Sequence, residues 1–225
     1  MTDSEKVNLI DSIENTDNFT EEHFKTVLKY ISDKDAFVRS RCVYILGEFI
    51  LADFRTESVI RLLLEMCSDE DAFVRTEAYD SLSLFPDGRA ESLLYKAILN
   101  EPDELARGYS VLAWSDIVYC LHEKYDDDIK FLLDILEREK SEMCLLDCWY
   151  GLYRFGYGQA LSNMLNFLKS NDYCRRCAVL NLLSDIMKKE DKDIIIFAVE
   201  ELLKIEKTTA VKSDAEKIMT LLSGM

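Results

Sequence analysis

The sequence predicts an all-α fold, a right-handed α-solenoid of about six helix pairs preceded by an N-terminal capping helix. Three observations predict it: a repeated segment, aligned apolar columns, and few helix-breaking residues. Residues 32–39 read Ser-Asp-Lys-Asp-Ala-Phe-Val-Arg, and residues 68–75 repeat this segment with seven of eight positions identical. Self-similarity at such a period is typical of stacked supersecondary units.

The arginine that ends each segment sets a register for the rest of the chain. The residue before each equivalent position is apolar, the third residue after it is small, and the seventh is large and apolar. Offsets of −1, +3 and +7 share one helix face, so these columns predict a buried stripe on the second helix of each unit. The equivalent positions are predicted at Arg39, Arg75, Arg107, Leu145, Arg175 and Lys212.

A second apolar-periodic stretch precedes each of these helices and predicts the first helix of the pair. Asp35 and Asp71 are candidate N-caps of second helices, and Asp126-Asp127-Asp128 opens a first helix where carboxylates suit the helix dipole. The predicted first helices cover residues 20–31, 56–67, 89–99, 127–138, 158–169 and 192–205.

Residues 4–14 are predicted to form a further helix that covers the open end of the stack. The only prolines, Pro86 and Pro102, fall at predicted turns between helices. The predicted organisation is one domain over residues 1–225, with a cap over 1–19 and repeats over 20–225.

The pattern Asp-x-x-Val-Arg-x-x-Ala-x-x-x-Leu, clearest in residues 35–46 and 71–82, resembles the HEAT repeat in its short bacterial form. The resemblance covers about residues 20–225. The unit around 141–155 departs most, because Leu145 replaces the arginine. The resemblance implies a solenoid whose usual role is to present a binding surface.

The seven cysteines follow the register of the repeats more than any metal or disulfide pattern. Cys42 and Cys148 fall in the small column, whereas Cys144 and Cys174 fall in the apolar column. Cysteine packs as a small hydrophobe, so these four are predicted to be reduced core residues. By the same register, Cys177 is the only cysteine predicted to point toward solvent.

Charge is the second informative feature. The formal net charge is −16, and residues 51–150 contain 23 acidic and 10 basic residues. One interpretation is general solubility, and the other is attraction of a basic partner; both stay open. HEAT-like DNA glycosylases carry a basic groove, so this acidity argues against nucleic-acid binding.

The start of the chain lacks the character of a signal peptide, and no apolar run suits a membrane. We expect a soluble, cytoplasmic protein that is monomeric when free.

Catalytic signals are sparse. Phosphate-binding glycine loops and nucleophile motifs are absent from the sequence. His122-Glu123 resembles one iron-binding pair of deoxyhypusine hydroxylase, a HEAT-repeat enzyme that needs several such pairs. We therefore predict no catalytic, cofactor or metal site, with His122 as a helix C-cap.

Residues two, five and nine positions after each register residue lie away from the buried stripe. In HEAT-like folds the second helices line the concave surface, so the resemblance implies that these positions face a groove. Carboxylates beside tyrosines suit recognition of lysine and arginine. Asp80 and Asp147 are expected to be exposed, Trp114 to be core, and Trp149 to be half-buried. The predicted protein-binding residues are Glu77, Asp80, Tyr109, Asp116, Asp147 and Tyr150.

These features favour a non-enzymatic protein-binding solenoid that captures a basic protein. Size, charge and repeat type resemble bacterial immunity proteins, which block a cognate toxin domain that is often a cationic nuclease. The alternatives are a general adaptor or scaffold subunit, and a HEAT-like lyase or metal-dependent hydroxylase.

Overall fold

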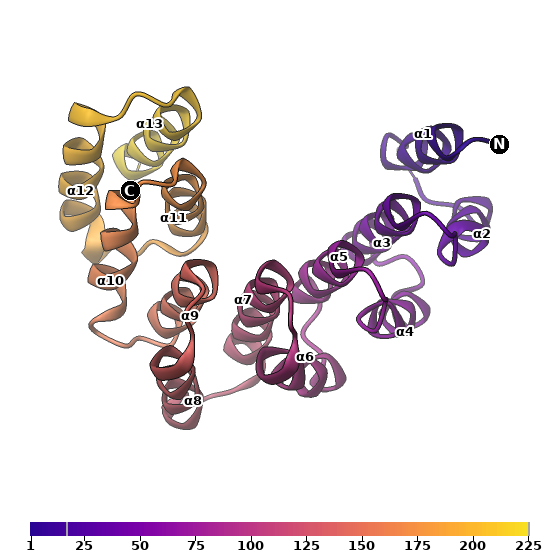
Figure 1. The fold of residues 1–225 in the computed structure, drawn as a ribbon, viewed down its shortest axis with the longest axis horizontal. Helices are drawn as coiled ribbons and strands as arrows, with labels where there is room; N and C mark the ends of the chain where they lie inside the picture. The colour runs from indigo at the N-terminus through magenta and orange to yellow at the C-terminus, as the bar shows by residue number, and fades with distance from the viewer. Residues whose placement is uncertain (17, 225) are drawn as a thin grey trace. The chain divides into compact units, whose positions relative to one another are not determined.

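The computed structural model describes residues 1–16 and 18–224. Over these residues the chain forms thirteen α-helices and two short 3₁₀-helices, with no β-strand (Figure 1). Close contacts divide the chain into two compact units, Met1–Lys124 and Tyr125–Met225. The all-α prediction is confirmed, whereas the right-handed sense of stacking and the single continuous domain stay predictions.

Unit 1 contains a capping helix followed by three helix pairs. Helices α1, α3, α5 and α7 pack one against the next, and α2, α4 and α6 pack against this row (Figure 1). The bounds are α1 Asp3–Glu14, α2 Glu21–Tyr30, α3 Ala36–Leu51, α4 Thr56–Met66, α5 Ala72–Ser83, α6 Gly88–Asn100 and α7 Glu104–Leu121.

Unit 2 contains three further pairs, in which α9, α11 and α13 pack in succession and α8, α10 and α12 are their partners. The predicted helix over 158–169 is divided into α10 and a short 3₁₀ turn. The bounds are α8 Asp126–Arg138, α9 Glu142–Arg154, α10 Ala160–Asn166, η1 Phe167–Lys169, α11 Tyr173–Ile186, η2 Lys189–Asp191, α12 Lys192–Ile205 and α13 Thr209–Ser223. No helix of the described residues is long and apolar enough to cross a bilayer.

Four of the second helices, α3, α5, α7 and α11, begin where an aspartate satisfies a backbone amide left unpaired at the helix start. The Asp35 carboxylate accepts the amide of Val38 at 3.1 Å, and the Asp71 carboxylate accepts the amide of Phe73 at 2.9 Å. Both predicted N-caps are confirmed. Asp103 and Asp172 cap α7 and α11 in the same way.

The core of unit 1 follows the predicted stripe. Val38, Cys42 and Leu46 of α3 are fully buried, as is Ala78 of α5. Where α3 contacts α5 at Gly47, a Cβ atom would lie 2.9 Å from the Ser81 hydroxyl oxygen, closer than van der Waals contact allows. Small residues are therefore required where neighbouring second helices meet.

The register arginines link one repeat to the next. Arg39 donates from Nη1 to the Asp33 carbonyl at 2.8 Å, and from Nε and Nη2 to the Asp69 carboxylate at 2.7 Å each. Arg75 repeats this with the Asp69 carbonyl at 2.8 Å and the Glu101 carboxylate at 2.8 and 2.6 Å. Each arginine thus fixes the turn before its own helix and the corresponding turn of the following repeat.

The predicted register was wrong by one residue in α11. Arg176, not Arg175, donates to the carbonyl six residues earlier, that of Ser170, and to the Glu206 carboxylate at 2.6 Å. These hydrogen bonds lower the pKa of Glu206 to about 2. Cys174 is consequently exposed rather than packed in the apolar column.

The buried stripe of α11 shifts with its arginine. Val179 and Leu183, three and seven residues after Arg176, are fully buried. Cys177 is half-buried, and Cys120, which the register did not single out, is exposed. The prediction that Cys177 alone faces solvent was therefore wrong.

Helix α1 packs against α3 in the row of second helices and shares features of their starts. Thr2 caps it four residues before Lys6, and the Lys6 ammonium lies 2.7 Å from the Asp33 carboxylate. Lys6 thus takes the place that Arg39 and Arg75 take further along. In unit 2 the Leu145 repeat lacks the arginine, and Ser170 stands where the following repeat would supply the carboxylate. Both members of that polar link are replaced together.

Candidate functional site

Three of the predicted site residues in unit 1 are carboxylates that act on one another electrostatically. Glu77 and Asp80 lie three residues apart on α5, so they share one helix face, and Asp116 lies on the neighbouring α7. Asp80 is exposed, whereas Glu77 and Asp116 are half-buried. The structure therefore gathers negative charge on the solvent-facing side of α5 and α7.

The pKa values of Glu77 and Asp80 are raised first by burial and then by a neighbouring carboxylate. Burial and the nearby Asp80 carboxylate raise the pKa of Glu77 to about 7, against the opposing influence of Arg41. Partial burial and the Asp116 carboxylate raise the pKa of Asp80, whose side chain still meets solvent. Glu77 is therefore partly protonated near neutral pH, and a cation brought to this face would favour its ionised form.

The α1–α3 end of the same face is internally paired. Arg41 lies 2.7 Å from the Asp11 carboxylate and 3.2 Å from that of Glu14, and its guanidinium lies 4.4 Å from the centre of the Tyr44 ring. The Tyr44 hydroxyl donates to Glu14 at 2.8 Å. The negative character of the face is thus strongest over α5 and α7, where Tyr109 lies half-buried.

The two predicted site residues in unit 2 are not accessible. Asp147 and Tyr150 of α9 are 1% and 4% exposed, which contradicts the expectation of a solvent-facing Asp147. Their offsets from the register residue are the same as those of Glu77 and Asp80, so the offset alone did not predict their burial. The Tyr150 hydroxyl accepts a hydrogen bond from Arg154 at 3.1 Å.

Asp147 is an unusual buried carboxyl group. Its Oδ2 atom makes no hydrogen bond, and burial raises its pKa to about 8 even though Arg175 opposes the shift. A carboxyl group in this state is protonated at neutral pH and carries no charge for a partner to recognise. We therefore withdraw Asp147 and Tyr150 from the candidate binding surface, leaving Glu77, Asp80, Tyr109 and Asp116.

The two tryptophans behave as the register predicts. Trp114 of α7 is 2% exposed and belongs to the core, and Trp149 of α9 is half-buried. Neither is a binding residue of the candidate face.

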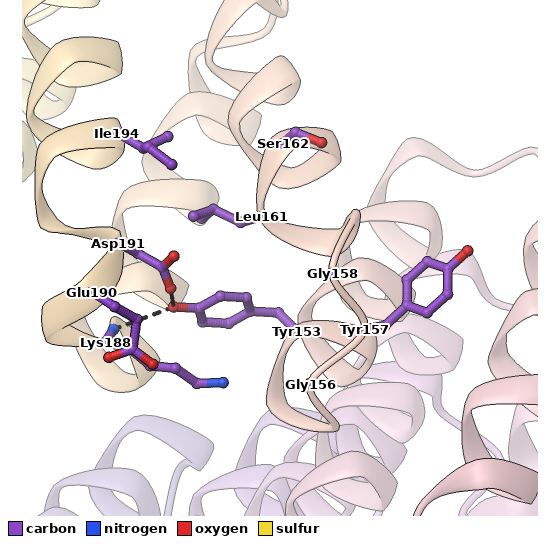
Figure 2. A pocket seen from close by; sticks show the side chains of 10 residues that line it. All are labelled: Tyr153, Gly156, Tyr157, Gly158, Leu161, Ser162, Lys188, Glu190, Asp191 and Ile194. Atoms are coloured by element: carbon purple, nitrogen blue, oxygen red, sulfur yellow. Dashed lines mark hydrogen bonds between the residues drawn. The ribbon is translucent and has the colours of Figure 1, made fainter.

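The sequence missed a pocket of about 270 Å³ in unit 2, between the α9–α10 turn and the start of α12 (Figure 2). Tyr153 crosses it and donates to Asp191 at 2.5 Å while accepting from the Lys188 amide at 3.2 Å. Gly156, at φ +83°, makes the turn on the opposite side. The hydrogen bond between Tyr153 and Asp191 joins α9 to the start of α12 across the pocket. Of the residues that line the pocket, only the Gly156-x-Gly158 turn is recognisable from the sequence.

The histidines and cysteines form no metal centre in the residues that the structure describes, where no group of three or more His, Cys, Asp or Glu side chains is placed to hold an ion. His122 is the C-cap of α7, as predicted, and its Nε2 lies 3.3 Å from Glu91 of α6. Cys42 and Cys148 are buried as predicted, and burial raises the pKa of Cys42 to about 12.

Comparison with known proteins agrees with this architecture. Residues 25–114 match the family model for HEAT repeats. The chain is similar to a structure of the CpcE–CpcF complex of phycocyanin lyase from Nostoc sp. PCC7120, with 13% identity, a TM-score of 0.51, and coverage of 93% of this chain and 96% of that one. No curated protein matches the sequence.

Two further solved structures are more distant. An archaeal HEAT-like repeat protein from Thermococcus onnurineus NA1 shares 15% identity over 100% of this chain and 98% of its own, with a TM-score of 0.43. Human deoxyhypusine hydroxylase shares 13% identity over 99% of this chain and 98% of its own, with a TM-score of 0.39. Identities at this level concern the fold alone. On the family match and the observed helices, the chain is an all-α protein built from HEAT-like repeats.

Proposed function

We propose that this chain is a non-enzymatic protein-binding solenoid that captures a basic protein segment on unit 1. The binding face consists of Glu77 and Asp80 of α5 with Tyr109 and Asp116 of α7. The observation that carries the proposal is the gathering of three carboxylates on the solvent-facing side of α5 and α7, where burial and, after it, repulsion from the Asp80 carboxylate raise the pKa of Glu77 to about 7. A bound lysine or arginine relieves that repulsion.

The chemistry of the face assigns different roles to its residues. The carboxylates attract a cationic partner and speed its association, an effect that salt weakens. Tyr109 adds apolar area and a ring that a cation can approach, which lengthens the life of the complex. The net charge of −16 extends the attraction beyond the face itself.

Within this class, we propose an immunity protein that neutralises a cationic toxin domain such as a nuclease. Its support is the acidity of a small repeat protein and the placement of that acidity on a helix face suited to a protein partner. A scaffold subunit of a larger complex is the alternative within the same class. The two differ in outcome, because an immunity protein abolishes the activity of its partner whereas a scaffold leaves it intact.

The test begins with recovery of the partner from native cells by the purified chain, followed by titration with Asp80→Lys. The matched control is Glu65→Lys on α4, which makes the same change of charge at an exposed site away from the face. We expect Asp80→Lys to slow association markedly at low salt and Glu65→Lys to have a small effect. Equal binding by the two variants would show that the acidity serves solubility and not recognition.

A further inference from the structure

An exposed apolar row crosses unit 1 at the N-terminal ends of its second helices. Phe37 of α3, Phe73 of α5 and Leu105 of α7 each lie two residues before a register arginine, and they are 53%, 48% and 43% exposed. The Phe37 and Phe73 rings are nearly parallel, with centroids 6.5 Å apart. Large apolar side chains held open to solvent in a regular row indicate a surface made to be covered.

This row adjoins the acidic face. Phe73 precedes Glu77 by four residues and Asp80 by seven, so all three lie along one side of α5. Leu105 stands in the same relation to Tyr109, also four residues later on α7. The surface therefore has an apolar strip at one edge and carboxylates beside it.

The segments that carry the apolar row are acidic, as is the neighbouring face of α5 and α7. The segments 33–39, 69–75 and 101–107, which carry the row, contain eight acidic and four basic residues, whereas the equivalent segments of unit 2, 139–145, 170–176 and 206–212, contain four and five. Arg39 and Arg75 are engaged with carboxylates of the stack, while the Glu70 side chain is 89% exposed. The positions of unit 2 that correspond to the row hold Met143, Cys174 and Ala210, so the combination of large apolar groups and acidity belongs to unit 1.

We infer that the occupant of this surface is a basic amphipathic helix that lies across α3, α5 and α7, with its apolar stripe on Phe37, Phe73 and Leu105 and its lysine or arginine side chains toward Glu77 and Asp80. The inference rests on the proposed function and specifies the partner. Residues four apart on a helix are separated by about 6 Å along its axis, which matches the spacing of the phenylalanine rings. Such a helix meets an apolar anchor and a carboxylate at each repeat it crosses.

The test uses two synthetic peptides of the same leucine and lysine composition, one with leucines at helical spacing and one scrambled. We expect the intact chain to bind the amphipathic peptide about tenfold more tightly than the scrambled one, by fluorescence anisotropy. The double variant Phe37→Ser/Phe73→Ser should lose that preference and keep only weak, salt-sensitive binding of both peptides. Phe197→Ser on α12 is the control, because this side chain is 66% exposed in unit 2.

Leu105→Ser should weaken the preference in part, and thermal unfolding of each variant verifies that the fold is intact. Equal affinity of the intact chain for both peptides overturns the inference, as does loss of the preference in Phe197→Ser alone. A dimer in sedimentation velocity that disappears in the double variant also overturns it, since the occupant is then a second copy. If the peptides fail while Asp80→Lys still impairs a recovered basic partner, the helix is wrong and the proposed function stands.

Discussion

Arg39 of α3 holds Asp69, which follows α4, through two hydrogen bonds of 2.7 Å each. The same carboxylate accepts the backbone amide of Asp71 at 2.9 Å and so shapes the turn that starts α5. One aspartate thus completes the turn of its own repeat and joins that repeat to the previous one. Arg75 with Glu101 and Arg176 with Glu206 reproduce the link.

Loss of one member of the link should be costly, and loss of both should cost less. Arg75→Leu leaves the buried Glu101 carboxylate without its guanidinium, which should lower the free energy of unfolding by about 3–5 kcal/mol. Arg75→Leu/Glu101→Ser copies the natural Leu145 and Ser170 positions and should recover part of that loss. Urea unfolding measures both variants. A double variant less stable than the single would refute this interpretation of the paired replacement.

The buried carboxyl group of Asp147 should make stability fall as pH rises. Its pKa is near 8 in the folded chain and near 4 when unfolded, so the folded state binds the extra proton between these values. The contribution of this group to the free energy of unfolding is therefore largest below about pH 4 and decreases as the pH rises to about 8. Asp147→Asn removes the ionisation and should be more stable than the parent at pH 9 by about 2–5 kcal/mol.

Thermal unfolding at pH 6 and pH 9 checks the Asp147 prediction, and the gain should be smaller at pH 6. Asp147→Lys should unfold the chain, because the side chain that the sequence predicted to be exposed is buried and an unpaired ammonium group there would be costly. An asparagine variant with the pH dependence of the parent would show that Asp147 is not the titrating group.

Binding of a basic partner should strengthen with pH around neutrality. Because Glu77 titrates near pH 7 and a cation prefers its ionised form, affinity should rise up to about tenfold from pH 6 to pH 8. Glu77→Gln should flatten this profile while it lowers affinity at pH 8. The dissociation constant of the recovered partner at the two pH values is the measurement. Glu65→Gln serves as control and should leave the profile unchanged.

Substitutions of small residues should lower stability where the residue is tightly packed and have little effect where it is exposed. Ala78 is fully buried on α5, so Ala78→Leu should overpack the core and cost about 1–3 kcal/mol. Cys42→Ala and Cys148→Ala should be mild, under about 1.5 kcal/mol, since the small column accepts alanine elsewhere. Cys174→Ala, now known to be at an exposed site, should change stability by less than about 0.5 kcal/mol. Chemical unfolding curves rank the four variants, and a neutral Ala78→Leu would contradict the tight contact.

The purified chain should contain neither zinc nor iron in stoichiometric amount. Cys42, Cys144 and Cys148 are packing residues, and His122 lies against Glu91 at a helix end. Elemental analysis by mass spectrometry tests this prediction and separates the binding proposal from a metal-dependent hydroxylase. A bound metal that is lost in His122→Ala would favour the enzyme.

The sequence by itself determined the repeat, the helices and most of the register. Apolar and small residues recur at −1, +3 and +7 because each repeat buries the same face of its second helix against its neighbours. This periodicity can be recognised in the sequence alone. The N-caps Asp35 and Asp71 were visible because capping depends on residues within one turn. The register error in α11 arose because Arg175 and Arg176 are adjacent, and the choice between them depends on Glu206, thirty residues beyond Arg176 in the chain.

Only the tertiary structure decided which residues on the outward offset meet solvent. Glu77 and Asp147 occupy equivalent helical positions, two residues after their register residues, yet Glu77 is half-buried whereas Asp147 is 1% exposed. Helical offset gives the direction of a side chain, whereas burial depends on everything packed around it, which periodicity does not record. The sharing of charge among Glu77, Asp80 and Asp116 likewise depends on the distance between helices, and so do the pKa values that give the candidate face its chemistry.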